Sequence, residues 1–204
     1  MKKYSLLVVL IFGILFPVWA QQDSLQIARS VKHFQEELNQ EYRDPKKSPL
    51  AKEEIAAFKG HEFFPVAARF VVNATFVKTE NPETFKMKTS TDRLPEYVKY
   101  GEAHFVLEGK PQVLEIYQSV ALREKPEFKD YLFLPFTDAT NGEETYGGGR
   151  YLDLKIPANQ TIALDFNKAY NPYCAYSKRY SCPVPPMANR LDVAIKAGVK
   201  KPQE

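Results

Sequence analysis

The spacing of apolar residues changes from about four to two near residue 60. Before that point they recur at every third or fourth position, as on one side of a helix: Ile27, Val31, Phe34, Leu38 and Tyr42. Proline disfavours helical geometry in the residue before it, so Asp44-Pro45 predicts the end of this helix. A shorter helix is expected between Ser48, a good N-cap, and Gly60, which can close a helix. The segment 21–60 is therefore predicted to be helical.

From Phe63 onward, apolar residues tend to alternate with their neighbours, as they do in strands. The longest alternating stretch, 66–77, predicts a central strand with one fully apolar face. Further strands are expected at 85–89, 97–108, 112–120, 131–136, 150–156 and 161–166. Gly109-Lys110 predicts a tight hairpin, and residues 157–160 predict a hairpin-type turn.

The end of the chain is also expected to be ordered. Asn189 is a suitable cap for a last helix, in which Leu191, Ala194 and Ile195 share one face, and Gly198 is placed to end it. Together these patterns predict an α+β, β-rich fold of about seven mainly antiparallel strands. We expect a sandwich or a partly open barrel, two N-terminal helices and a short C-terminal helix.

The first twenty residues have the pattern of a secretory signal peptide. Lys2 and Lys3 precede an apolar run, and Val18 and Ala20 are small residues at the positions that a signal peptidase reads. The alternative is an uncleaved anchor, but the apolar run is shorter than the roughly 20 residues that span a bilayer. We therefore divide the chain into a signal peptide (1–20), a helical segment (21–60) and a β-rich domain (61–204). The mature protein is expected to be periplasmic or secreted, without stable membrane insertion.

Charge and composition narrow the possible partners. The chain of 204 residues has 28 Lys and Arg against 25 Asp and Glu, and two of the lysines belong to the expected signal peptide. This near balance gives no reason to expect nucleic acid as a partner. The sequence points to no cofactor and to no metal, because the three histidines are scattered and no second cysteine pair stands at ligand spacing.

Cys174 and Cys182 lie in a loop rich in Pro and Tyr. In an oxidising compartment, two cysteines this close in sequence predict a disulfide. A half-complete metal site and a free or nucleophilic thiol are the alternatives. The same loop carries four tyrosines that could line a surface for a sugar or a lipid-sized ligand: Tyr170, Tyr173, Tyr176 and Tyr180.

Polar residues in and around the last two predicted strands form a second candidate group. They are Asp138, Arg150, Asp153, Asp165, Asn167 and Asn171. Tyr151 and Asp153 alternate with Leu152 and Leu154, so they should face away from the apolar layer. One interpretation is structural, with the aspartates bracing loops and Arg150 bridging them. The other is a pocket for a small polar ligand, formed by Tyr146, Arg150, Asp165, Asn167 and Asn171.

Catalysis would need a group that transfers a proton. His61 could act as a general base with Asp138 or Asp165, although a single histidine at a helix end is more often a packing residue. The chain contains no G-x-S-x-G, P-loop or H-E-x-x-H motif. The balance therefore leans away from an enzyme.

Several stretches in order resemble one protein family. They are Leu134–Gly142, Thr145-Tyr146, Gly149–Leu152, Leu164–Pro172, Cys174–Tyr176, Cys182-Pro183, Pro185-Pro186, Asn189, Leu191 and Ala197-Gly198. They are similar to the bacterial family catalogued as domain of unknown function 1684, here in a short form with a signal peptide. The resemblance is strongest over 131–200, weaker over 60–130, and is lost before Gly60, where many members have a Trp- and Gly-rich segment. It implies a shared fold, but no established activity.

Three functional hypotheses follow. The first is an extracytoplasmic module that binds a small polar ligand at its C-terminal loops. The second is a hydrolase that uses an Asp/His pair. The third is a structural, envelope-associated protein in which the polar group only fastens the fold.

Overall fold

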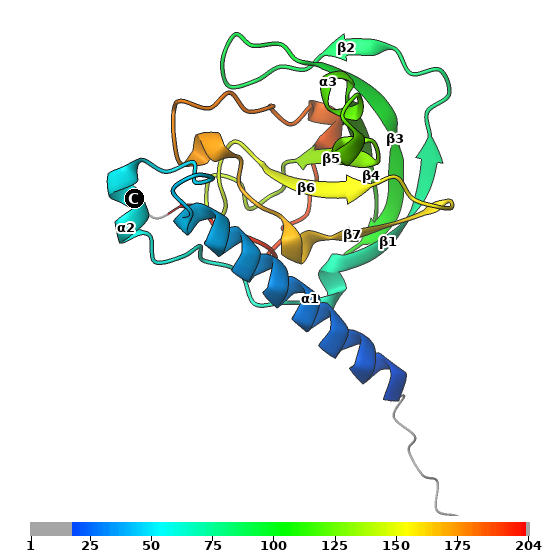
Figure 1. Cartoon of the computed structure of the whole chain (residues 1–204). Coiled ribbons are helices and arrows are strands. Elements are labelled where there is room, and N and C mark those ends of the chain that lie inside the picture. Colours follow the sequence, from blue (N-terminus) through cyan, green and yellow to red (C-terminus); the bar gives the residue numbers. More distant parts are fainter. Residues whose placement is uncertain (1–17, 203–204) are drawn as a thin grey trace, which may run out of the picture.

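The computed structural model describes residues 18–202, and its strands form one antiparallel sheet (Figure 1). The strands are β1 (Val71–Lys78), β2 (Thr84–Lys86), β3 (Glu96–Leu107), β4 (Lys110–Ser119), β5 (Tyr131–Phe136), β6 (Arg150–Lys155) and β7 (Thr161–Asp165). Their order in the sheet is β6-β5-β4-β3-β1-β7, and β2 pairs with β3. The expected β-rich fold with seven antiparallel strands is confirmed.

The longest pairing joins β3 to β4. Their register runs from Tyr97 opposite Ser119 to Leu107 opposite Lys110. The connecting residues Glu108 and Gly109 both have positive φ, 50° and 73°, as a two-residue hairpin turn requires. The predicted hairpin therefore forms, with its turn one residue earlier than expected.

The sheet curls into a half-barrel. Strands β6 and β7 follow each other in the chain but lie at opposite edges of the sheet. The short segment 156–160 joins them, so the two edges must approach each other. The hairpin that we expected between these strands is wrong, because β6 pairs with β5 and β7 pairs with β1.

The concave face of the half-barrel holds the main hydrophobic core. Its central residues include Phe105, Leu114, Leu134, Leu152 and Leu164, one from each of five strands. A second cluster lies on the other face of β5 and β6, where Phe133 and Tyr151 pack near Tyr97 and Tyr117. Tyr151 and Leu152 thus face opposite sides, as their alternation predicted.

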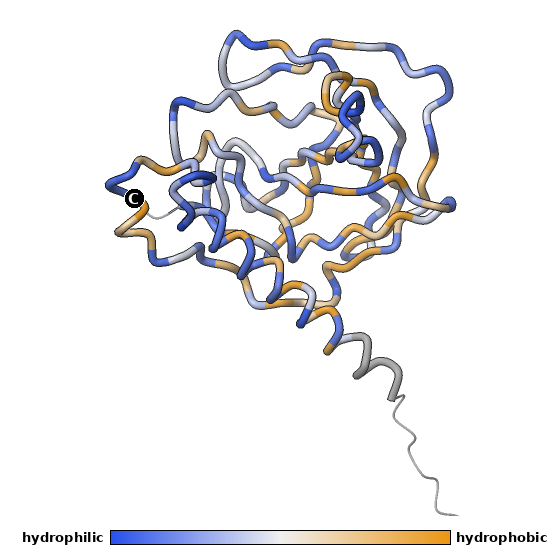
Figure 2. The backbone as a smooth tube through the Cα atoms, viewed as in Figure 1, coloured by the Kyte–Doolittle hydropathy of each residue, from blue (hydrophilic) through white to orange (hydrophobic). Residues whose placement is uncertain are grey.

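Two helices precede the sheet: α1 (Val18–Arg43) and α2 (Lys52–Ala57). Figure 1 shows α1 running diagonally past the sheet, and Figure 2 shows hydrophobic and hydrophilic residues following one another along it. Val31 and Tyr42 from its predicted apolar side are buried, and the helix ends just before Asp44. Helix α2 begins after Ala51 rather than at Ser48, and the Glu54 side chain accepts the Ala51 amide hydrogen bond at 2.8 Å.

Several short helices precede, connect or follow the strands: α3 (Val120–Arg123) and the 3-10 turns η1 (Ala68–Phe70), η2 (Pro126–Phe128), η3 (Phe166–Lys168), η4 (Tyr173–Ala175) and η5 (Met187–Asn189). The predicted C-terminal α-helix is wrong. After η5 the chain is extended, and Leu191, Val193, Ile195 and Ala197 enter the core at every second position. Ala194 is exposed instead of sharing a helical face with Ile195.

Most of the predicted signal peptide lies outside the described residues, so its removal stays a prediction. Among the helices between residues 18 and 202, none combines the length and the apolar character needed to cross a membrane.

Candidate functional site

Arg150 joins β6 to the extended C-terminal segment. Its Nη2 donates to Asp138 Oδ2 and to the carbonyl oxygen of Ile195, each at 2.8 Å. Its Nη1 donates to the carbonyl oxygens of Ala197 and Val199. Gly149 has a φ of +88°, which lets the loop turn back just before the arginine. Both side chains of the ion pair are fully excluded from solvent, and burial lowers the pKa of Arg150 while Asp138 opposes that shift.

The asparagines and Asp165 form similar internal contacts. Asn167 is buried and exchanges hydrogen bonds with the Ala67 backbone, at 2.9 and 3.1 Å. Asp165 accepts the Asn167 side-chain amide at 2.9 Å. Asn171 is also buried, and it donates to Tyr176 and to the Lys200 carbonyl oxygen. These contacts favour the bracing interpretation of the polar group.

The surroundings of His61 do not suit a general base. Its Nδ1 lies 2.9 Å from Asn39 Oδ1 rather than at either candidate aspartate. Aromatic rings surround it, among them Tyr42 and Tyr176. Burial, followed by the nearby Arg43, lowers the pKa of His61 to about 4. The imidazole is therefore neutral in the folded protein near pH 7.

Cys174 and Cys182 lie side by side as free thiols. The Cys174 amide donates to Cys182 Sγ at 3.1 Å. A hydrogen bond with Cys182 is the main cause that lowers the pKa of Cys174 to about 6, and Tyr146 contributes in the same direction. The structure thus brings the pair together without a bond between the sulfurs, and it places Tyr146 beside Cys174.

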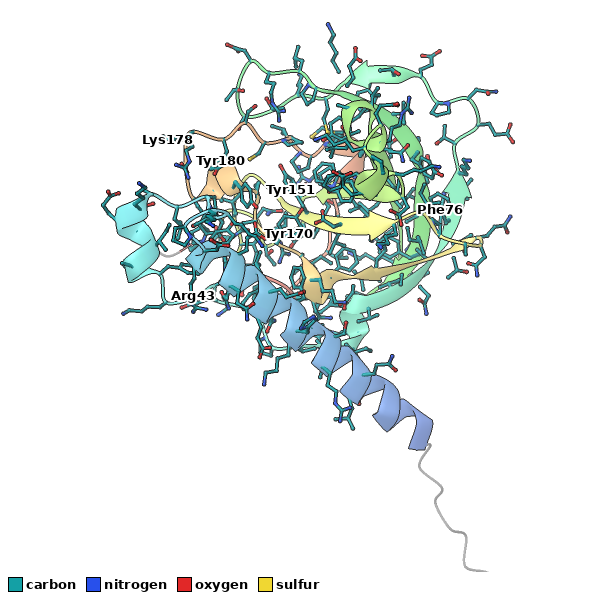
Figure 3. The ribbon with its side chains drawn as sticks, viewed as in Figure 1. Arg43, Phe76, Tyr151, Tyr170, Lys178 and Tyr180 are labelled. Atoms are coloured by element: carbon teal, nitrogen blue, oxygen red, sulfur yellow. The ribbon has the colours of Figure 1, made fainter. Side chains whose placement is uncertain are left out.

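A cavity of about 800 Å³ lies between α1 and the outer face of the sheet. Its walls are α1, the start of β3, α3, strands β5 and β6, and the two chain segments 170–173 and 180–183. Figure 3 shows Tyr151, Tyr170 and Tyr180 in this part of the molecule. The aromatic residues that line it are Phe34, Tyr97, Tyr131, Phe133, Tyr151, Tyr170, Tyr173 and Tyr180.

Packing among the aromatic rings defines the walls. Phe133 and Tyr151 meet edge to face, with 4.7 Å between ring centroids, and Tyr151 meets Tyr170 at 5.9 Å. Tyr173 and Tyr180 form a second pair at 5.1 Å. Tyr151 and Tyr170 also exchange backbone hydrogen bonds, so segment 170–173 is fixed to the edge strand β6. Contacts of this kind hold aromatic walls in place without a ligand.

Asp153 supplies a carboxylate to this cavity. The hydroxyl groups of Tyr131 and Tyr170 donate to its Oδ1 at 2.7 and 2.6 Å. The side chain is surrounded by protein but open to solvent through the cavity. Desolvation raises the pKa of Asp153 despite the two hydroxyl donors, and the charge of Glu41 adds to the increase.

Helix α1 adds acidic residues to the opposite wall. Glu37, Glu41 and Asp44 all line the cavity, and the Tyr173 hydroxyl donates to Glu41 Oε1. Glu37 and Glu41 lie one turn apart on the same side of α1, and Asp44 follows directly after the helix ends at Arg43. Together with Asp153 they make four acidic groups in the lining, against one basic residue, Lys47.

None of the ligand residues proposed from sequence lines this cavity; those are Tyr146, Arg150, Asp165, Asn167 and Asn171. The tyrosine-rich loop was the better signal, because three of its four tyrosines line the cavity and Tyr176 instead packs on Tyr42 and His61. The alternation along β6 also placed Asp153 on the face away from the core, where it lines the cavity. The acidic residues at the end of α1 and just after it, Glu37, Glu41 and Asp44, were missed, although their spacing could have revealed them.

Comparisons with known proteins agree with the resemblance seen in the sequence. A family described as a protein of unknown function, DUF1684, matches residues 56–200. The solution NMR structure of an uncharacterized protein of Haloarcula marismortui is similar, with 33% sequence identity and a TM-score of 0.68. That match covers 88% of this chain and 97% of the other. No curated protein matches the sequence. The chain therefore belongs to the DUF1684 family of proteins of unknown function.

Proposed function

We propose that this protein binds a small organic ligand in the cavity between α1 and strands β5 and β6. The observation that carries the proposal is the open carboxylate of Asp153 inside an aromatic-walled cavity of about 800 Å³. Cavities that hold small ligands commonly measure about 300 to 1,000 Å³ and combine apolar walls with a few polar groups. Asp153 and Glu41 supply polar groups of that kind.

The proposed location of the protein is periplasmic or extracellular. This rests on the signal-peptide pattern of residues 1–20. Among the side chains described in α1, the first that is fully buried is Val31, well beyond the expected cleavage point before Gln21. Cleavage there leaves the cavity wall formed by Phe34–Asp44 intact. In such a compartment the adjacent Cys174 and Cys182 would form the predicted disulfide.

The hydrolase hypothesis has less support. It required His61 to pair with Asp138 or Asp165, and the His61 ring instead hydrogen-bonds Asn39 among aromatic side chains. The structural hypothesis explains Arg150 and its partners but does not explain an open, acidic cavity on the other side of β6.

A thermal-shift screen of a metabolite library tests the proposed site. A compound that binds only the folded state must raise the unfolding midpoint. Leu38 lines the cavity from α1, so Leu38→Trp should fill part of it and abolish the shifts seen with the wild type. Lys32→Trp is the matched control, because Lys32 is exposed on α1 and lies outside the lining. A screen without hits, or hits that Leu38→Trp retains at full size, would contradict the proposal.

A further inference from the structure

The charge of the cavity lining indicates what class of ligand it takes. Four carboxylates and one lysine line the walls, so the formal charge of the lining is negative. A carboxylate in a recessed site pays a desolvation cost that a cation can offset. Desolvation is the main cause that raises the pKa of Asp153, which agrees with such a cost, and the charge of Glu41 adds a smaller contribution. An anionic ligand is therefore disfavoured.

We infer that the ligand is a small organic cation, a primary or methylated ammonium group on an apolar body. This inference rests on the function proposed above and specifies its ligand. The ammonium group would lie between Asp153 on β6 and Glu41 on α1, and the apolar body would lie along the aromatic walls.

The hydrogen bonds at Asp153 suit this role. Both tyrosine hydroxyls donate to the same oxygen, Oδ1, so neither uses Oδ2. Those hydroxyls fix the orientation of the carboxylate without neutralising it, because a hydroxyl brings no charge. Glu41 is held in the same manner by the Tyr173 hydroxyl. Two oriented carboxylates on facing walls thus present negative charge to the cavity.

The aromatic residues add a second attraction for a cation. The negative faces of tyrosine and phenylalanine rings bind ammonium groups, and cages of such rings recognise methylated ammonium ligands. Tyr151, Tyr170, Tyr173 and Tyr180 line the same cavity as Asp153 and Glu41. Because their hydroxyl or ring edges already pack against protein, these rings are held rigidly.

A divalent metal fits the lining less well than an organic cation. Calcium and magnesium take several oxygen ligands that converge on one point. Among residues 18–202, apart from the side chains that are not described, no three His, Cys, Asp or Glu side chains gather closely enough to hold a metal ion. The carboxylates are spread over a large cavity instead, which matches a ligand with an extended apolar part.

Three probes of similar shape test the inference by calorimetry: 2-phenylethylammonium, its N-trimethyl derivative and neutral 2-phenylethanol. We expect at least one of the two cations to bind about tenfold or more tightly than the alcohol. Asp153→Asn keeps an acceptor for both tyrosine hydroxyls and should remove most of that preference. Asp130→Asn is the control, because Asp130 is an exposed carboxylate that does not line the cavity.

Glu41→Gln on the opposite wall gives a second, independent variant if Asp153→Asn does not fold. Equal binding of the cations and the alcohol would overturn the inference, as would an unchanged preference in both variants. No binding of any probe would also overturn it. If the library screen then yields a neutral ligand such as a disaccharide that Leu38→Trp rejects, the proposed function stands and only its ligand class is wrong. If nothing binds in either experiment, both fail.

Discussion

Arg150 Nη2 lies 2.8 Å from Asp138 Oδ2, and both side chains are fully buried. Removing one partner of a buried ion pair leaves an uncompensated charge, so we expect Arg150→Met to lower the free energy of unfolding by about 3 to 5 kcal/mol. Urea denaturation measures the change. The control is Arg190→Ala, which removes an exposed ion pair with Asp192. This change should lower the free energy of unfolding by at most about 1 kcal/mol. Equal losses in the two variants would show that the buried pair does not brace the fold.

The pKa of His61 predicts a pH-dependent stability. The folded value of about 4 lies below the ordinary 6.5, so at intermediate pH the unfolded chain binds a proton that the folded protein does not. The free energy of unfolding should therefore fall as pH decreases from about 6.5 toward 4. Between about pH 7 and pH 5, the free energy of unfolding of His61→Gln should fall by roughly 1 to 2 kcal/mol less than that of the wild type.

Denaturation curves at several pH values provide the measurement for His61. His33→Gln is the control, because His33 is exposed on α1 and His61 is unchanged in this variant. Its free energy of unfolding should depend on pH as that of the wild type does. If His61→Gln also follows the wild type, the histidine is not buried in its neutral form.

The two cysteines should be oxidised in protein isolated from an oxidising compartment. Their loop is short, so a disulfide is expected to stabilise the fold by roughly 2 to 3 kcal/mol. Counting thiols in denatured, unreduced protein should give none, and two titratable thiols would refute the disulfide. In the reduced protein, the lowered pKa predicts that Cys174 reacts with iodoacetamide near pH 7 before Cys182 does, which peptide mass spectrometry can check.

Cation binding should weaken on acidification. Asp153 faces the hydroxyls of Tyr131 on β5 and of Tyr170, and it experiences the charge of Glu41 on α1. Its raised pKa means that protonation begins at a higher pH than for an ordinary aspartate, and the neutral form no longer attracts a cation. The dissociation constant for 2-phenylethylammonium should therefore rise as pH falls through this pKa. In Asp153→Asn that part of the dependence should disappear, and its persistence would place the titrating group elsewhere.

Alternation along single strands predicted most of the sheet, because one buried face leaves a clear period of two. Leu152, Leu154 and Asp153 were placed on their correct sides for this reason. The strand expected at 66–77 begins only at Val71, because residues 68–70 form a 3-10 turn. The same alternation was overlooked after Asn189, because Leu191 and Ile195 also fit a helical spacing. That segment is extended because its carbonyl oxygens accept from Arg150, a contact between residues far apart in sequence.

The location of the proposed ligand site was harder to predict than its residue types. A dense motif around Arg150 suggested a ligand site, yet its hydrogen bonds are made within the protein. The cavity instead lies between α1 on one side and β6 and the tyrosine loop on the other. In the sequence, α1 is separated from both by about a hundred residues or more. Pairing of Tyr151 with Tyr170 brings β6 and the tyrosine loop together, and the Tyr173 hydroxyl, which donates to Glu41, connects that loop to α1.

Mapping of backbone amide chemical shifts is the most direct test of ligand binding in the cavity between α1 and strands β5 and β6. The protein would be titrated with the compound that gives the largest thermal shift, and the assigned amides would be followed to saturation. We expect saturable shifts concentrated in Phe34–Asp44, around Asp153 and in Tyr170–Pro183, with weaker effects in Leu38→Trp. Shifts centred instead on Arg150, Asn167 and the C-terminal segment, or no saturable shifts at all, would contradict it.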